Sequence, residues 1–219
     1  MFVEEKLSNF DDFLDKDWFI TINGLVKNTK LEPIVGNFTM NWWGNARAFI
    51  LPFLLVTGVS DVINETISHS FKPSPQKIWD GYLNFNEFNV ALWKLSENTY
   101  CSLFFAYENL IVNILKVVTG SPIRVTAQKN FNKALKDIYN EQVAHKVWHQ
   151  TLVYTARESR NSIVHNGGKA TRKLLKIKPL PAYIQSEDVI ISAKITRKLY
   201  NDLKPLIYEY VEKSIEKLQ

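Results

Sequence analysis

Apolar residues recur mainly every three or four positions over most of the chain, which is the spacing of amphipathic helices. In the first third, this spacing predicts helices over residues 2–14 and 46–69. The segment between them, 31–45, contains one proline and two glycines and is expected to be an irregular connection. Pro73 and Pro75 end the second helix, because proline disfavours helix at the residue before it.

The middle of the chain is also predicted to be helical. Residues 84–118 form one long helix or two, and their second half, 103–111, is apolar nearly all round, as in a central helix of a bundle. A short basic helix is predicted over 126–138 and a long helix over 141–164. The Gly-Gly pair at 167–168 supplies the left-handed conformation that commonly ends a helix.

The spacing of apolar residues changes after this pair. Residues 174–178 and 183–191 flank two prolines, and the second run is rich in β-branched residues, so a short β-hairpin is predicted near 174–191. Residues 192–219 resume the helical spacing, with Pro205 expected to kink or break the last helix. The predicted fold is therefore mainly all-α, a single helical bundle over residues 1–219.

Composition agrees with a folded bundle. Of the 219 residues, 46% are hydrophobic and 13% aromatic, which excludes intrinsic disorder because such chains lack aromatics and carry a large charge excess. The one cysteine, Cys101, excludes an internal disulfide framework and a cysteine-based zinc finger.

No membrane span or export signal is predicted. The apolar stretch 49–59 lies between Arg47 and Asp61 and is shorter than the roughly 20 residues that a spanning helix needs. The first residues are acidic, the reverse of the positively charged start of a signal peptide. The expected location is the cytoplasm.

Positive charge is concentrated in one segment. The whole chain has a net charge of +5, whereas residues 122–178 contain twelve Lys/Arg against three Asp/Glu, a local charge of +9. This asymmetry favours an anionic partner, with nucleic acid as the first candidate. The alternative is a solvated helical surface with surplus lysines.

The most informative residues lie at the end of the helix predicted over 141–164. Asn161 and His165 are four residues apart and share one face of that helix. Arg160 lies about 140° from His165 on an ideal helix, and its long side chain can bend back toward it. Arginine binds phosphoryl oxygens with two donors, histidine moves protons near neutral pH, and an amide can orient either one. The alternative is that Arg160 and His165 only cap their helix.

The run Arg160-Asn161-Ser162-Ile163-Val164-His165 resembles the R-N-x-x-x-H signature of the HEPN superfamily, and the following Asn-Gly-Gly resembles the I-V-H-N-G-G variant of some members. That superfamily comprises helical-bundle ribonucleases and their relatives in toxin–antitoxin, phage-defence and CRISPR systems. The resemblance covers about 84–219 and leaves 1–83 as a helical extension without assignable chemistry.

The resemblance implies a metal-independent endoribonuclease that needs no cofactor and works as a homodimer, with two motifs meeting in one cleft. His165 would act as general base or acid, Arg160 would stabilise the charged phosphorane, and Asn161 would hold the site in register. A polar residue on the preceding core helix often joins such a site, and Glu108 and Asn109 are the candidates. The alternative role for Glu108 is to neutralise Arg160 as a core ion pair.

Several basic residues around the motif are weaker candidates for RNA contact. They are Arg157, Lys169, Arg172 and Lys173. By resemblance, the partners would be an RNA substrate, a second copy of the chain, and an antitoxin or defence partner, with no membrane.

Other features carry less information. His145 and His149 have a spacing compatible with zinc, but the glutamate of an H-E-x-x-H protease is absent and no third ligand is apparent, so no metal is predicted. Trp42 and Trp43 are suited to base stacking or, as the simpler expectation, to packing in a core or dimer contact. The usual glycine-rich nucleotide-binding loops are absent from the sequence.

Three classes of function are consistent with these features. The first is a HEPN-type endoribonuclease, a toxin or anti-phage effector. The second is a non-catalytic HEPN-like module that binds RNA or protein. The third is a helical partner of a nucleotidyltransferase, in which Arg160 and His165 touch a nucleotide. The motif favours catalysis, although fold and function separate easily.

Overall fold

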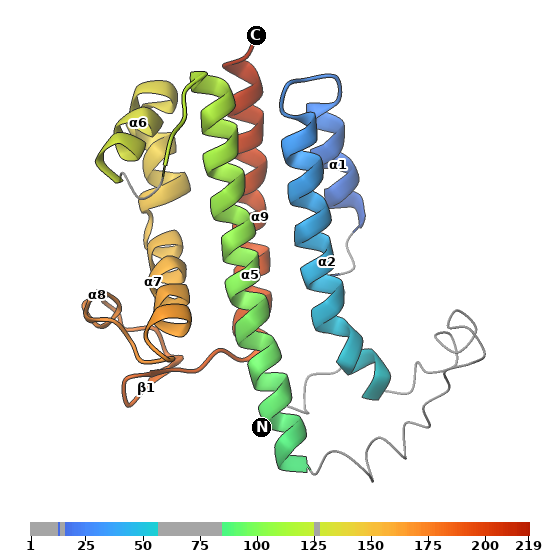
Figure 1. Cartoon of the computed structure of the whole chain (residues 1–219), viewed down its shortest axis with the longest axis vertical. Helices are drawn as coiled ribbons and strands as arrows, with labels where there is room; N and C mark the ends of the chain where they lie inside the picture. The colour runs from blue at the N-terminus through green and yellow to red at the C-terminus, as the bar shows by residue number, and fades with distance from the viewer. Residues whose placement is uncertain (1–12, 14–15, 57–84, 125–127) are drawn as a thin grey trace, which may run out of the picture.

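The computed structural model describes residues 13, 16–56, 85–124 and 128–219, and this part of the chain is a mainly helical bundle. Figure 1 shows α5 in the middle, with α9 behind it, α1 and α2 on one side, and α6 above α7 on the other. The elements are α1 (Lys16–Val26), α2 (Glu32–Val56), α5 (Phe85–Thr119), α6 (Gln128–Ala144), the π-helical segment η2 (His145–His149), α7 (Thr151–His165), α8 (Arg172–Leu175), β1 (Ile184–Gln185), β2 (Asp188–Val189) and α9 (Ala193–Glu216).

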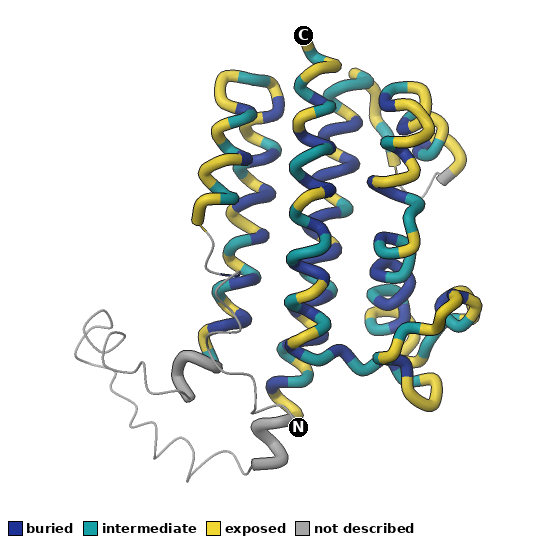
Figure 2. The backbone as a smooth tube through the Cα atoms, turned by 180° about the vertical axis from the view of Figure 1, so that it is seen from behind, coloured by how far each residue is buried: buried dark blue, intermediate teal, exposed yellow. Residues whose placement is uncertain are grey.

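Helix α5 is the central helix, and it is continuous over the segment predicted as one helix or two. It packs against α2, α9, α7 and α6, and many of its apolar residues between Leu92 and Leu115 are buried. Figure 2 shows such buried positions along each of the long helices of the bundle. Tyrosine hydroxyls tie neighbouring elements together: Tyr107 donates to the Val147 carbonyl, and Tyr210 donates to the Ile111 carbonyl at 3.0 Å. These bonds satisfy hydroxyls that the surrounding side chains remove from water.

Among the described residues, one helical stretch, Val90–Thr119 in α5, has the length and apolar composition of a membrane span. Half of its most apolar window is buried inside the bundle. A central helix meets the same two criteria because neighbouring helices surround it. The apolar character of α5 is therefore accounted for by its contacts with α2, α7 and α9.

The irregular connection predicted over 31–45 is wrong, because this segment is the first half of α2. Pro33 is tolerated in the first turn, where backbone N–H groups have no acceptor within the helix. The two glycines cost about 1 kcal/mol each relative to alanine inside a helix. Burial of Trp42, which stacks on Tyr200 with ring centroids 5.2 Å apart, outweighs that cost. Trp42 is thus a core residue, as the simpler expectation had it.

The predicted helix over 141–164 is interrupted. Asn140, with a left-handed φ of 73°, kinks α6 between the two segments predicted as separate helices, 126–138 and 141–164. Within 141–164, residues 145–149 form η2, and Gln150 is extended at φ −59° and ψ 152°. The interruption turns Trp148 inward, where it packs on Phe131 with ring centroids 4.7 Å apart. Tertiary packing of this residue therefore overrides the regular helical spacing, and the motif lies on a separate helix, α7.

The predicted hairpin is present, but both strands lie within the run 183–191. Ile184 pairs with Val189 and Gln185 with Asp188 in antiparallel register. The two residues between the strands have φ values of 48° and 70°, as in a tight type I′ connection. The other predicted strand, 174–178, instead includes the end of the short helix α8, whose Leu174 is buried.

Helix α9 closes the bundle and confirms the predicted C-terminal helix. It begins after Ser192, whose hydroxyl accepts a hydrogen bond from the Ile195 N–H as an N-cap. The helix continues to Glu216 and is not broken at Pro205, which is exposed. The helix predicted over 2–14 lies outside the described residues except for Phe13, which stacks on Tyr200. Of the helix predicted over 46–69, the part up to Val56 belongs to α2 and the rest lies outside the described residues.

Stability should depend on the buried face of α5. Leu103 is fully buried, so Leu103→Ala is expected to lower the free energy of unfolding by about 2–5 kcal/mol. Phe105 lies on the same helix but is 56% exposed, so Phe105→Ala should change the free energy of unfolding by roughly 0.5 kcal/mol or less. Urea denaturation followed by circular dichroism measures both values, and equal losses would contradict the placement of α5.

Candidate functional site

The Arg160 guanidinium occupies the junction of α7 and α5. Its Nη1 donates to Asn161 Oδ1 at 3.0 Å, and its Nη2 donates to Glu108 Oε2 at 2.6 Å. The side chains of Arg160 and Glu108 are only 17% and 13% exposed, so water screens this ion pair less than a surface pair. Arg160 therefore bends toward Asn161, its neighbour in sequence, and its orientation is fixed by two acceptors.

The structure separates the two candidate supporting residues on α5. Glu108 faces α7 and pairs with Arg160, whereas Asn109 is exposed and lines a different cavity, toward α2. That cavity also includes Asn37 and Asn41 of α2 and has a volume of about 340 Å³. Of the two candidates, only Glu108 is thus close to the motif. Its ion pair with Arg160 matches the alternative role, in which Glu108 neutralises Arg160.

His165 is the last residue of α7 and is exposed to solvent. The turn behind it is well defined: the N–H groups of Asn166 and Gly168 both donate to the Ser162 carbonyl, at 3.1 and 3.0 Å. Gly167 and Gly168 have φ values of 58° and 84°, so the predicted glycine ending is confirmed. The backbone of His165 is held in place while its imidazole is open to a ligand.

A buried polar network beneath the motif was not anticipated from the sequence. The Ser162 hydroxyl donates to the Glu158 carbonyl at 2.8 Å and accepts from the Thr171 N–H at 3.1 Å. The Thr171 hydroxyl donates to Glu158 Oε2 at 3.4 Å. These bonds join α7 to the loop after the glycines. The signal in the sequence was a run of polar residues on the face of α7 that points inward.

Cys101 lies on α5 close enough to Arg160 for their charges to interact. Burial raises the pKa of the Cys101 thiol to about 11, although the positive charge of Arg160 acts in the opposite direction. The thiol is therefore protonated at neutral pH and is a poor nucleophile.

The four weaker RNA-contact candidates fall into different environments. Arg157 is only 9% exposed, and its guanidinium lies over the rings of Trp148 and Tyr154, at 5.0 and 5.5 Å from their centroids. Burial lowers the pKa of Arg157. The structure therefore places Arg157 below the surface rather than beside the other three.

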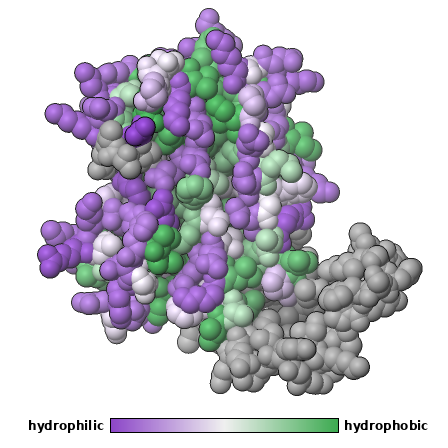
Figure 3. All heavy atoms as spheres, in the orientation of Figure 1, coloured by the Kyte–Doolittle hydropathy of each residue, from purple (hydrophilic) through white to green (hydrophobic). Residues whose placement is uncertain are grey.

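The remaining three candidates, Lys169, Arg172 and Lys173, are exposed. Lys169 forms an ion pair with Asp188 at 2.7 Å, and both side chains are about half exposed. Figure 3 shows that the side of the molecule formed by α6, α7 and α8 is mainly hydrophilic. Such a surface can approach a polyanion without burying apolar side chains.

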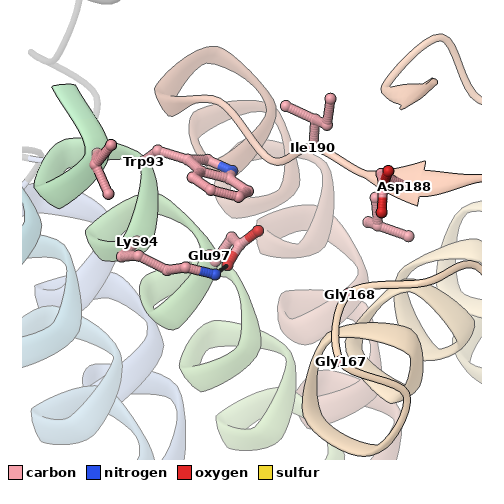
Figure 4. Close-up of a pocket in the computed structure, with 9 residues that line it drawn as sticks. Trp93, Lys94, Glu97, Gly167, Gly168, Asp188 and Ile190 are labelled. Carbon is pink, nitrogen blue, oxygen red and sulfur yellow. Dashed lines mark hydrogen bonds and ion pairs between the residues drawn. The ribbon is translucent and has the colours of Figure 1, made fainter. Parts of the chain in front are cut away.

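A mostly apolar cavity of about 370 Å³ lies beside the turn that follows His165. Figure 4 shows Trp93, Lys94 and Glu97 of α5 facing the loop with Gly167 and Gly168. Glu97 is 3% exposed and accepts a 2.7 Å salt bridge from Lys94. The apolar lining of the cavity comes from Val90, Trp93, Val189 and Ile190.

The histidine pair considered for zinc, His145 and His149, lies on η2. Within residues 13, 16–56, 85–124 and 128–219, no group of three His, Cys, Asp or Glu side chains is arranged to hold a metal ion. His145 is exposed, and burial lowers the pKa of His149, helped by the positive charge of Arg157.

No family model matches the chain, no curated protein matches it, and no solved structure matches it. Membership of the HEPN superfamily therefore depends on the motif and its surroundings, and it is a proposal.

Proposed function

We propose that this chain is a HEPN-type endoribonuclease that cleaves RNA without a metal, as a toxin or anti-phage defence effector. One observation carries the proposal: Arg160 is held by Asn161 and Glu108 at the half-buried junction of α5 and α7, five residues before an exposed His165 at the helix end. A guanidinium can stabilise charge on the transition state and an imidazole can transfer a proton, and phosphodiester cleavage by a 2′-hydroxyl uses both functions.

The proposed roles follow from these positions. The Arg160 guanidinium presents donors to the non-bridging oxygens, where negative charge increases in the transition state. His165 accepts the proton of the ribose 2′-hydroxyl or donates one to the leaving 5′-oxygen. Asn161 and Glu108 act through Arg160, because each accepts a hydrogen bond from it and so sets the plane of the guanidinium. They are positioning residues in this scheme.

A second function, a non-catalytic HEPN-like module that binds RNA or protein, is favoured by one observation. Glu108 already neutralises Arg160, and a half-buried ion pair of this kind can hold α5 and α7 together without any reaction. Incubating purified protein with total RNA in the presence of EDTA separates the two. The enzyme shortens RNA, whereas a binding module only retards its mobility. Intact RNA under every condition tested would contradict the nuclease.

The nuclease is expected to be a homodimer. Cleavage benefits from two proton-transfer groups, while each chain has one motif histidine, and a two-fold contact brings both copies into one cleft. Val164, next to His165, is apolar and 54% exposed, which suits an interface. Light scattering should therefore give twice the mass of one chain.

Variants on the surface test where this dimer forms. Val164→Glu should weaken dimerisation and RNA cleavage together, because it places a charge at the proposed contact. Ile20→Glu is the matched control, since Ile20 is 70% exposed on α1, which lies across the bundle from α7 (Figure 1). A stable monomer that cuts RNA would contradict the composite site.

A further inference from the structure

A second group of basic side chains lies at the other end of α7, away from Arg160. It lines a cavity of about 330 Å³ formed by the end of η2, the first turn of α7, and the segment with α8 and the residues after it. The polar residues that line this cavity are His149, Thr151, Tyr154, Lys173, Lys176 and Lys178. Among the described residues that line it, none is acidic, so the lysine charges are not neutralised from within the cavity.

Next to residues that line this cavity are two buried donors with no acceptor among the described residues. Arg157 is nine-tenths buried, with its guanidinium over the ring of Tyr154, and its Nη1 makes no hydrogen bond in the structure. The Nε2 of Gln150, the residue between η2 and α7, is likewise buried without a partner. The Arg157 guanidinium does not line the cavity, but it places a positive charge directly behind Tyr154, which does.

The charges that act on the His149 imidazole are positive. Burial lowers the pKa of this imidazole, and the positive charges of Arg157 on α7 and Lys136 on α6 lower it further. The three lysines that line the cavity add to this positive charge. Such a field repels a metal cation and attracts an anion.

We propose that this cavity binds a phosphoryl group. A phosphoryl group carries several acceptor oxygens and up to two negative charges, which matches the ammonium groups of the three lysines and the hydroxyls of Thr151 and Tyr154 that line the cavity. The cavity lies within the segment 122–178, whose local charge is +9.

The position of the cavity indicates where the phosphoryl group comes from. Tyr154, Asn161 and His165 follow one another at steps of seven and four residues, so they share one face of α7, and none of the three is buried. Tyr154 and His165 are about 17 Å apart along the axis, at 1.5 Å per residue. An RNA strand lying along this face would place one phosphate in the cavity and another at His165. This assignment to RNA rests on the proposed function, whereas phosphoryl binding itself does not.

The test follows the imidazole resonances of the full-length protein by NMR during two titrations. One uses inorganic phosphate, with chloride at the same ionic strength as the comparison, and the other uses a 2′-O-methyl RNA oligonucleotide that cannot be cleaved. Phosphate should shift the His149 resonance and raise the pKa of that imidazole, because a bound anion favours the charged ring. If the His149 resonance responds to phosphate but not to RNA, the cavity binds a free phosphoryl ligand. If it responds to RNA but not to phosphate, the cavity binds a phosphate of the RNA backbone.

Matched variants separate this site from the motif. The double variant Lys173→Gln/Lys176→Gln should bind the ligand that shifts the His149 resonance at least about tenfold more weakly, because two charged donors are lost. Lys217→Gln is the control, since that exposed lysine lies at the far end of the bundle from α8 (Figure 1). His165→Ala should leave the His149 response to phosphate unchanged.

Three results would overturn the proposal: no His149 response to either ligand, an equal response to chloride, or an unchanged response in the double lysine variant. A folded protein that never cuts RNA but shows the His149 response would refute the nuclease and leave the phosphoryl site standing. RNA cleavage without any His149 response would refute the phosphoryl site and leave the nuclease standing.

Discussion

His165→Ala is expected to reduce RNA cleavage by roughly 10²–10⁴-fold, the usual effect of losing a general acid or base. The fold should be retained, because the side chain is exposed and the helix ending is held by backbone bonds to the Ser162 carbonyl. Cleavage rates of a fluorescent RNA in EDTA, together with the melting temperature of each protein, measure the two effects separately.

His145→Ala is the matched control for this variant, since His145 is also an exposed histidine but lies on η2. It should cleave RNA at the wild-type rate. A folded His165→Ala protein with normal activity would show that the imidazole takes no part in the reaction, and an equal loss in both variants would point to a general effect of removing surface histidines.

Arg160→Lys is expected to lower the cleavage rate by about 10²–10³-fold, the effect of removing one oxyanion donor. Lysine keeps the positive charge but loses the planar guanidinium, which here donates to Asn161 and Glu108 through two different nitrogens. Arg124→Lys is the control, because Arg124 is an exposed arginine just after α5. If Arg160→Lys cleaved RNA normally, a point charge would be sufficient and the fixed guanidinium would be unnecessary.

Glu108→Gln distinguishes a positioning role from a structural one. Glutamine has the same size and can still accept a hydrogen bond, but it removes the charge that neutralises Arg160. A positioning role predicts slower cleavage with an unchanged KM and melting temperature. A core ion pair predicts a lower melting temperature, since the half-buried guanidinium then has no counter-charge.

Much of the helical architecture was predictable from the spacing of apolar residues. The central helix over 84–118, the Gly-Gly ending of α7 and the C-terminal helix all follow from local patterns, because each depends on neighbouring positions in sequence. The prediction for 31–45 is wrong because proline and glycine indicate only local preference, whereas burial of Trp42 against Tyr200 stabilises a helix there.

The site was predictable only in its residue types. The sequence places Arg160, Asn161 and His165 on one helix, but it does not show which side of α5 meets α7. Glu108 and Asn109 are adjacent in sequence, yet only Glu108 faces Arg160. The interruption at Gln150 and the bonds from Ser162 to Thr171 also depend on long-range packing, which no local pattern reveals.

The most direct test of a composite nuclease site mixes wild-type and His165→Ala chains at equal concentration, allows subunits to exchange, and measures RNA cleavage in EDTA. If both histidines of a dimer are needed, only wild-type pairs are active, and the rate should fall to about one quarter of that of the same total amount of wild-type protein. A rate of about one half would mean that each chain acts alone, and no cleavage by the wild-type protein would contradict the nuclease itself.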